Sequence, residues 1–191
     1  MTNPVLDAIA TRDSCRTFTP EPVSQADLET LALAAVSAPS SRGNAPWKIV
    51  VVTDARLIQD ISDSAVALLA RHEPSAAEKF SAPSKNIFFG APAVFVIATK
   101  RTWDYVSEEL DAGLATQNLA LAATSLGLGS LICGYATQAF RDLKSTVADT
   151  LYQRLGISRE FEVTITVAVG HRGEPSTPHT PDLTAVSYIG A

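Results

Sequence analysis

Three polar side chains alternate along residues 11–18, which read TRDSCRTF: Arg12, Ser14 and Arg16. If this stretch is extended, side chains two residues apart point to the same face, so both guanidinium groups and the hydroxyl aim at one place. If it is helical, Arg12 and Arg16 still share a face, but Ser14 turns away. The pattern therefore indicates either an anion-binding site or the solvated end of a short first helix.

A second polar group lies in residues 37–47, SAPSSRGNAPW, between a predicted helix and a predicted strand. Pro39 ends the helix, and Ser40, Ser41 and Asn44 supply two hydroxyls and an amide. Serine, asparagine, glycine and proline are also the ordinary residues of loops. The segment is therefore either a plain connection or part of a site for a polyol or a phosphate.

Glycines and a cysteine occur together in residues 127–134, GLGSLICG. A dinucleotide fingerprint requires G-x-G-x-x-G between a strand and a helix, whereas Ile132 stands at the place of the third glycine and the predicted order is helix, glycines, strand. Gly127 is interpreted as a helix C-cap, and Gly134 as a position where backbone approaches a ligand closely. Cys133 is interpreted as a buried apolar residue rather than a nucleophile.

Several motifs that carry chemistry are missing from the sequence. It contains no GxxxxGK[ST], HExxH or GxSxG pattern, which P-loop, zincin and nucleophile-elbow chemistry require. Its three histidines, His72, His171 and His179, lack the spacing of metal ligands, so no metal site is predicted. Nothing in the sequence indicates that the protein's own side chains carry out difficult chemistry.

Hydrophobic periodicity predicts long helices interleaved with a few strands. We expect helices at residues 3–11, 24–38, 55–71, 104–126 and 137–155, and strands at 47–53, 91–99, 130–133 and 160–170. The β-branched run at 47–53 indicates a strand covered on both faces. Small residues in 111–125 suit either the core of the domain or the seam of a dimer. This pattern favours a layered α+β domain over a fully wound parallel sheet.

Length and composition limit the classes of protein. The 191 residues suit a single domain over 1–191 with an extended tail from about 171. A net charge of −5 argues against a nucleic-acid partner, and no apolar run is long enough for a membrane span. The N-terminus has no secretory pattern, and Cys15 and Cys133 are expected to be free thiols in a reducing compartment. A cytoplasmic location is therefore expected.

Four segments, in this order and spacing, resemble the FMN-dependent nitroreductase family. They read TRDSCRTF, APSSRGNAPWKIVVV, APAVFVIAT and DAGLATQNLALAATSLGLGSLICG, and VAVGHRGEP forms a matching close. The resemblance implies an α+β fold with a mixed sheet flanked by helices and a long central helix at a homodimer interface. It also implies FMN bound in two clefts between the subunits.

The resemblance assigns flavin-binding roles to three groups of residues. The first matches the family's R-x-S-x-R, whose basic residues hold the phosphate and the polar edge of the flavin. The second matches the segment that reaches the flavin from the partner subunit, and the third falls where backbone amides face the N5 side of the flavin. These groups are Arg12, Ser14 and Arg16; Pro39, Ser40, Ser41 and Asn44; and Ile132, Cys133 and Gly134.

Two positions depart from the family pattern. The family has N-x-Q-P-W where this chain reads GNAPW, so either Gly43 or Asn44 stands at the asparagine position. The family's terminal basic residue, which reaches the phosphate, is replaced by His179 in PHTP. Three alternatives follow: His179 contacts the phosphate weakly, Arg172 replaces the missing basic residue, or FMN binds less tightly. The stretch 72–90 does not align, although Lys85 or Asn86 could contact the flavin there.

The resemblance implies an NAD(P)H oxidoreductase that transfers hydride through FMN by a ping-pong route. The expected acceptors are small molecules such as nitroaromatics, quinones or activated alkenes, and the donor is NADH or NADPH. A flavin-based dehalogenase or a flavin-fragmenting relative is an alternative. A flavin-binding module without catalysis, or a dimeric scaffold that has lost its cofactor, is another.

Overall fold

The computed structural model describes residues 3–80, 86–100, 108–141 and 146–190. Its centre is a four-stranded sheet in the order β1-β2-β4-β3, in which every described pair of strands is antiparallel. The strands are β1 (Trp47–Val52), β2 (Ala93–Thr99), β3 (Gly129–Cys133) and β4 (Glu162–Gly170). The α+β class is confirmed, and the described pairings contain no parallel pair of the kind that a mixed sheet has.

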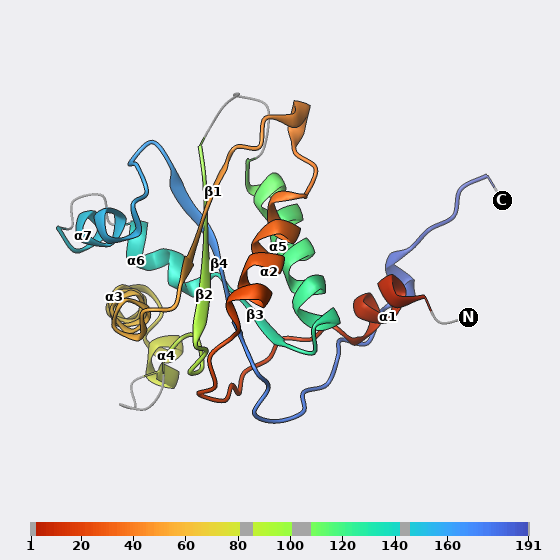
Figure 1. Ribbon diagram of the computed structural model, residues 1–191, viewed down its shortest axis with the longest axis horizontal. Coiled ribbons are helices and arrows are strands. Elements are labelled where there is room, and N and C mark those ends of the chain that lie inside the picture. The colour runs from red at the N-terminus through yellow and green to blue at the C-terminus, as the bar shows by residue number, and fades with distance from the viewer. Residues whose placement is uncertain (1–2, 81–85, 101–107, 142–145, 191) are drawn as a thin grey trace.

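Helices cover both faces of this sheet (Figure 1). On one side lie α2 (Gln25–Val36) and α5 (Glu108–Ser125), with α1 (Pro4–Thr11) beyond them. On the other side lie α3 (Ala55–His72), α4 (Pro74–Ala77), α6 (Gln138–Arg141) and α7 (Thr146–Leu155). Short 3₁₀ turns are η1 (Ser41–Gly43), η2 (Glu78–Phe80), η3 (Tyr135–Thr137) and η4 (Leu183–Ala185).

Strand β2 joins two hydrophobic cores, because its side chains alternate between the faces of the sheet. Val94 and Val96 belong to the core under α3, α6 and α7, whereas Phe95 and Ile97 belong to the core under α2 and α5. All seven residues of β2 are buried. The strand expected at 91–99 is therefore confirmed, and both of its faces are covered.

Strand β1 is an edge strand, which the sequence pattern did not predict. Its first five residues are partly or fully exposed, and only Val52 is buried. β1 pairs only with β2, and its other edge has no described neighbour. Both of its faces are nevertheless partly covered, as expected, since Val50 packs against one core and Ile49 and Val51 against the other. A β-branched run reports strand propensity, and strand propensity does not fix a strand's place in the sheet.

Most predicted helices form within a few residues of the expected limits. Ser24 caps α2, since its side-chain oxygen accepts a hydrogen bond of 3.1 Å from the Asp27 N–H. The helix expected at 137–155 is wrong as a single element, because η3 and α6 occupy its start and α7 begins at Thr146. The expected start of the 104–126 helix lies partly outside the described residues.

Helix α5 crosses the sheet with its small residues turned inward. Ala112, Ala115 and Ala120 are buried, and the side-chain amide of Asn118 donates a hydrogen bond of 3.2 Å to the Ala34 carbonyl in α2. The bond satisfies a polar group that would be costly to bury alone. Across the described parts of the chain, no helix has both the length and the apolar character of a membrane span.

Candidate active site

A cavity of about 960 Å³ lies beside the edge strand β3. Its walls come from four parts of the chain: the extended stretch 16–18, η2, the turn at 86–89, and residues from 131 to 141. The volume is within the range of cofactor and ligand sites. Of the residues singled out in the sequence, Arg16, Ile132, Cys133 and Gly134 line this cavity.

The segment that carries the two arginines is extended and passes along the end of β3. Asp13 and Cys15 are 3% and 1% exposed, whereas Arg16 is exposed and Arg12 and Ser14 are half-buried. This alternation confirms the extended interpretation. The Cys15 N–H donates to the Ser130 carbonyl of β3 at 2.9 Å, which fixes the segment beside the cavity.

Gly129 shows how closely this segment packs on β3. A Cβ at position 129 would lie 2.7 Å from the Cys15 Sγ and 2.8 Å from its Cβ. Both atoms belong to a side chain that is buried, so a larger residue would push the arginine-bearing segment away from the strand. Glycine at 129 therefore sets the distance between the arginines and β3.

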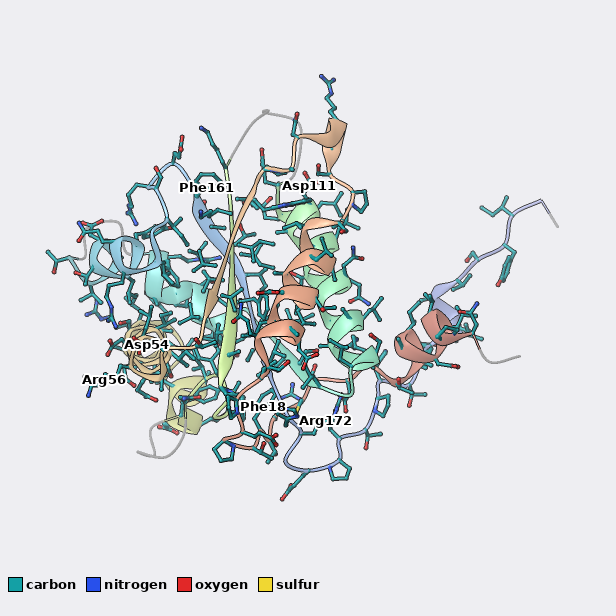
Figure 2. All side chains as sticks on the ribbon, in the orientation of Figure 1. Phe18, Asp54, Arg56, Asp111, Phe161 and Arg172 are labelled. Atoms are coloured by element: carbon teal, nitrogen blue, oxygen red, sulfur yellow. The ribbon has the colours of Figure 1, made fainter. Side chains whose placement is uncertain are left out.

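The same segment is tied to the chain that leaves β4. The Thr19 N–H donates to the His171 carbonyl at 2.9 Å, and the Gly173 N–H donates to the Thr17 carbonyl at 2.8 Å. Phe18 and Arg172 form an isolated antiparallel bridge and lie together at the lower end of the molecule in Figure 2. Segments about 150 residues apart in the chain, near Thr17 and His171, are therefore paired, and only the first of them lines the cavity.

The Arg172 side chain is engaged by Asp13. Its Nη1 donates to the Asp13 Oδ1 at 2.6 Å, and the Ser176 hydroxyl donates to the other carboxylate oxygen. Burial acts to raise the pKa of Asp13, but hydrogen bonds from Ser176 and Arg172, with the charges of Arg172 and Arg12, outweigh it and lower the pKa below its usual range. Arg172, a candidate for the terminal phosphate contact, does not line the cavity.

Asp13→Asn is expected to destabilise the fold by about 1–3 kcal/mol at pH 7, because Arg172 loses its charged partner. A carboxylate whose pKa is lowered in the folded state stabilises that state above its unfolded pKa of about 3.9. That contribution is lost as the pH falls through the folded pKa. Urea unfolding between pH 3 and pH 8 measures the free energy of unfolding of the wild type and of the variant. The difference between the two free energies should be constant above about pH 5 and should become smaller below about pH 4.

Asp63→Asn is the matched control, since Asp63 is exposed and accepts a hydrogen bond from the Gln59 side chain. It should change stability by less than about 0.5 kcal/mol. The role assigned to Asp13 would be contradicted if the wild type and Asp13→Asn had the same free energy of unfolding at pH 7. It would also be contradicted if the difference between them stayed unchanged down to pH 3.

The end of β3 exposes backbone to the cavity. Burial raises the pKa of the Cys133 thiol, and its Sγ lies 3.6 Å from the Ile87 carbonyl oxygen. The thiol is therefore protonated at neutral pH and suited to packing rather than to nucleophilic attack. Gly134 has φ −73° and ψ −31°, which any residue adopts, and an added Cβ would meet nothing nearer than Ile165 Cδ1 at 4.0 Å.

The second group, Pro39 to Asn44, lies away from the cavity in the same chain. The Ser41 N–H donates to the Asp111 carboxylate at 3.1 Å, and the Ala45 N–H donates to the Ser40 hydroxyl at 2.8 Å. Asp111 lies at the upper end of Figure 2, opposite Phe18. None of the four residues lines the cavity, and His179 is an exposed residue outside it.

Comparisons with known proteins identify the family. The sequence pattern that defines the Nitroreductase family matches residues 9–171. The chain belongs to the nitroreductase family. The match spans all four segments on which the resemblance was based, includes the stretch 72–90, and ends at residue 171 within the closing VAVGHRGEP.

Individual nitroreductases and their relatives match most of the chain. A nitroreductase with bound FMN from Desulfitobacterium hafniense is 34% identical, with a TM-score of 0.90 over 99% of this chain and all of its own. A protein of Archaeoglobus fulgidus, provisionally named NADH dehydrogenase/NAD(P)H nitroreductase, is 28% identical over 87% of this chain and 84% of its own length. A Bacteroides fragilis nitroreductase, 20% identical with a TM-score of 0.87, shows the shared fold.

Sequence reasoning missed much of this nitroreductase's cavity. Lys79, Phe80, Phe89, Tyr135 and Arg141 line it, yet they come from a region without a recognisable motif and from the residues after β3. Asn86, which was considered, also lines it, whereas Lys85 lies outside the described residues. The FF dipeptide before Gly90 was the one signal available, because paired aromatics at a turn are unusual for a plain loop.

Proposed function

We propose that this nitroreductase binds FMN in the cavity beside β3 and transfers hydride equivalents from NADH or NADPH to a small acceptor. Nitroaromatics, quinones and activated alkenes are the proposed acceptors. Membership of the family and the FMN-bound relative at 34% identity support the proposal. Two free buried thiols agree with the cytoplasm as its location.

Gly134 is the observation that carries the proposal. Its backbone angles do not require glycine, and the chain itself leaves the space of a Cβ open. The position lines the cavity next to Cys133, so a side chain there would occupy room that the fold does not use. Space kept free beside backbone at the end of a buried strand suits a flat ring system such as the flavin.

Two arginines of the extended segment, of which Arg16 lines the cavity and Arg12 does not, fit the other end of FMN. A phosphate monoester carries about −1.5 to −2 charge at neutral pH, and guanidinium groups bind it with two parallel hydrogen bonds. Arg12 and Arg16 extend from the same stretch of chain with Ser14 between them. We assign the phosphate and the polar edge of the flavin to these three residues.

Arg172 has a positioning role in this proposal. Its guanidinium is held by Asp13, and Asp13 lies between two of the proposed ligands, Arg12 and Ser14, in the sequence. The pair therefore fixes the extended segment and directs Arg12 and Ser14 to the other face of the chain. His179, exposed on the tail, remains open as an additional phosphate contact.

FMN, when bound, supplies the redox chemistry, accepting a hydride from NAD(P)H and delivering two electrons to the acceptor. The chain's own residues bind and orient the reactants. Cys133, with its raised pKa, stays a neutral thiol in the wall of the cavity and does not compete as a nucleophile. The Gly134 backbone leaves one wall of the cavity uncovered for the nicotinamide and then for the acceptor.

A second copy of the chain is part of the proposal. Twelve of the fifteen large hydrophobic residues that are exposed among the described residues belong to α1, to the α2–α5 layer and the turn after it, or to the tail. Leu33, Val36, Leu110 and Leu114 are on the outer side of α2 and α5. An apolar surface of this kind is typical of a face that another subunit covers.

The second copy would also bring the 39–44 segment to the flavin. In one chain that segment lies at the end of α5 opposite Phe18, so it cannot close the cavity of its own subunit. We propose that Pro39, Ser40, Ser41 and Asn44 of each chain complete the site of the other. The proposal explains why residues in a family motif stand away from the cavity.

Steady-state kinetics test the order of the two half-reactions. The donor and the acceptor use the same open wall in turn, so double-reciprocal plots against NADH at several concentrations of a quinone should be parallel. The same protein should be reduced by NADH under nitrogen with no acceptor present. Intersecting lines would show that both reactants bind together and would contradict the ping-pong route.

A further inference from the structure

The cavity beside β3 is positively charged although the protein as a whole is acidic. The chain has 20 acidic and 15 basic residues, yet the described lining of the cavity contains Arg16, Lys79 and Arg141 and no aspartate or glutamate. Charges of one sign around a concave surface concentrate ligands of the opposite sign. The ligands of this cavity are therefore expected to be anionic.

The proposed FMN accounts for Arg16, but Lys79 and Arg141 remain. Both are exposed residues, and the described part of the chain contains no ion pair for either of them. Its ion pairs use Lys100, Arg154, Arg159, His171 and Arg172. Lys79 and Arg141 are thus available to a ligand without first leaving a carboxylate partner.

Aromatic rings line the same cavity. Phe80 packs edge-on against Phe89 with ring centroids 5.8 Å apart, and against Tyr135 at 6.4 Å. Phe89 has a φ of 55°, a conformation that bulky residues rarely adopt. The Asn86 side chain supports it by accepting bonds of 3.1 Å from the Phe88 and Gly90 N–H groups. A turn held in this way presents ring surface to a planar ligand.

We propose that the acceptor is an aromatic anion, a ring that bears a carboxylate or sulfonate, and that Lys79 and Arg141 determine this specificity. The inference rests on the proposed function, because it concerns the acceptor of the same site. The aromatic wall receives the ring, and the two cations receive the anionic group. For a nitroarene the overall step is Ar–NO₂ + NAD(P)H + H⁺ → Ar–NO + NAD(P)⁺ + H₂O, a two-electron reduction.

The test compares 4-nitrobenzoate with its neutral analogue 4-nitrobenzamide on the FMN-loaded dimer. The two rings have nearly the same shape and differ by one charge. We expect kcat/KM to favour the anion by about tenfold, as charge-assisted hydrogen bonds provide. Lys79→Gln and Arg141→Gln should each lower kcat/KM for 4-nitrobenzoate about fivefold, and leave that for 4-nitrobenzamide within about twofold.

Two further measurements separate this proposal from other roles of the same cations. Unreactive benzoate should bind the oxidised protein more tightly than benzamide, and the variants should lose this preference in calorimetry. The rate of anaerobic reduction by NADH should be unchanged in both variants. Slower reduction by NADH with an unchanged preference for benzoate would assign Lys79 and Arg141 to the nicotinamide nucleotide and would overturn the proposal.

The two ways of failing are distinguishable. If the wild-type protein reduces 4-nitrobenzoate and 4-nitrobenzamide equally well, the proposed preference for anionic acceptors is wrong. The proposed function as an FMN-dependent reductase is then unaffected. If the protein neither holds FMN nor reduces either compound, the proposed function itself fails, and the inference about its acceptor fails with it.

Discussion

Replacing Leu33 with lysine is expected to convert the protein into a monomer that no longer retains FMN. Leu33 is 66% exposed on the outer side of α2, within the proposed interface and near the 39–44 segment in sequence. Burying a lysine there would leave a desolvated, unpaired charge from each subunit. Light scattering during gel filtration gives the mass, and the visible absorbance of the same peak gives the flavin content.

The substitution is chosen so that the fold of the single chain survives. Lysine is a good helix former, and a positive charge in the last turns of α2 suits the helix dipole. Ala67→Lys on α3 is the control, because position 67 is exposed on the opposite side of the sheet. That variant should remain a yellow dimer. A Leu33→Lys protein that stays dimeric and flavin-loaded would contradict the proposed interface.

Arg16→Ala is expected to weaken FMN binding by about 10- to 100-fold, since a charge-assisted hydrogen bond is worth about 1.5–3 kcal/mol. Arg16 is exposed, and its described hydrogen bond is a 3.3 Å contact with the Ser14 carbonyl. Stability of the apoprotein should therefore change by less than about 0.5 kcal/mol. Titration of apoprotein with FMN, followed by quenching of flavin fluorescence, measures the affinity.

Arg56→Ala provides the comparison for Arg16→Ala, because Arg56 is an exposed arginine on α3 that does not line the cavity. Figure 2 places its side chain at the outer margin of the molecule. The Arg56→Ala variant should bind FMN as tightly as the wild type does. If the wild type, Arg16→Ala and Arg56→Ala bound FMN equally tightly, the proposed contact between Arg16 and FMN would be wrong.

Local patterns in the sequence predicted local structure well. The i, i+2 spacing of Arg12, Ser14 and Arg16 leaves Asp13 and Cys15 on the other face, and both are buried. The spacing allowed either an extended or a helical chain, and the burial of Asp13 and Cys15 between exposed or half-buried neighbours decides for the extended one. The apolar run 93–98 of β2 predicted a buried strand, and every side chain of β2 is buried in the middle of the sheet.

Relations between distant segments could not be predicted in this way. The bond between Asp13 and Arg172 joins residues 159 positions apart, and nothing near either residue in the sequence indicates it. The cavity likewise combines η2, the turn at 86–89 and the residues after β3. Lys79 and Arg141 look like ordinary surface charges until the fold brings them to one cavity.

The central claim is that the cavity beside β3 holds FMN where NAD(P)H can reduce it. The visible absorption spectrum of the purified protein, recorded before and after anaerobic addition of NADH or NADPH, tests it most directly. The claim predicts a yellow dimer with FMN in an amount equal to that of the chain, bleached by at least one of the two nucleotides. A colourless protein that takes up no added FMN, or a yellow one that neither nucleotide bleaches, would contradict it.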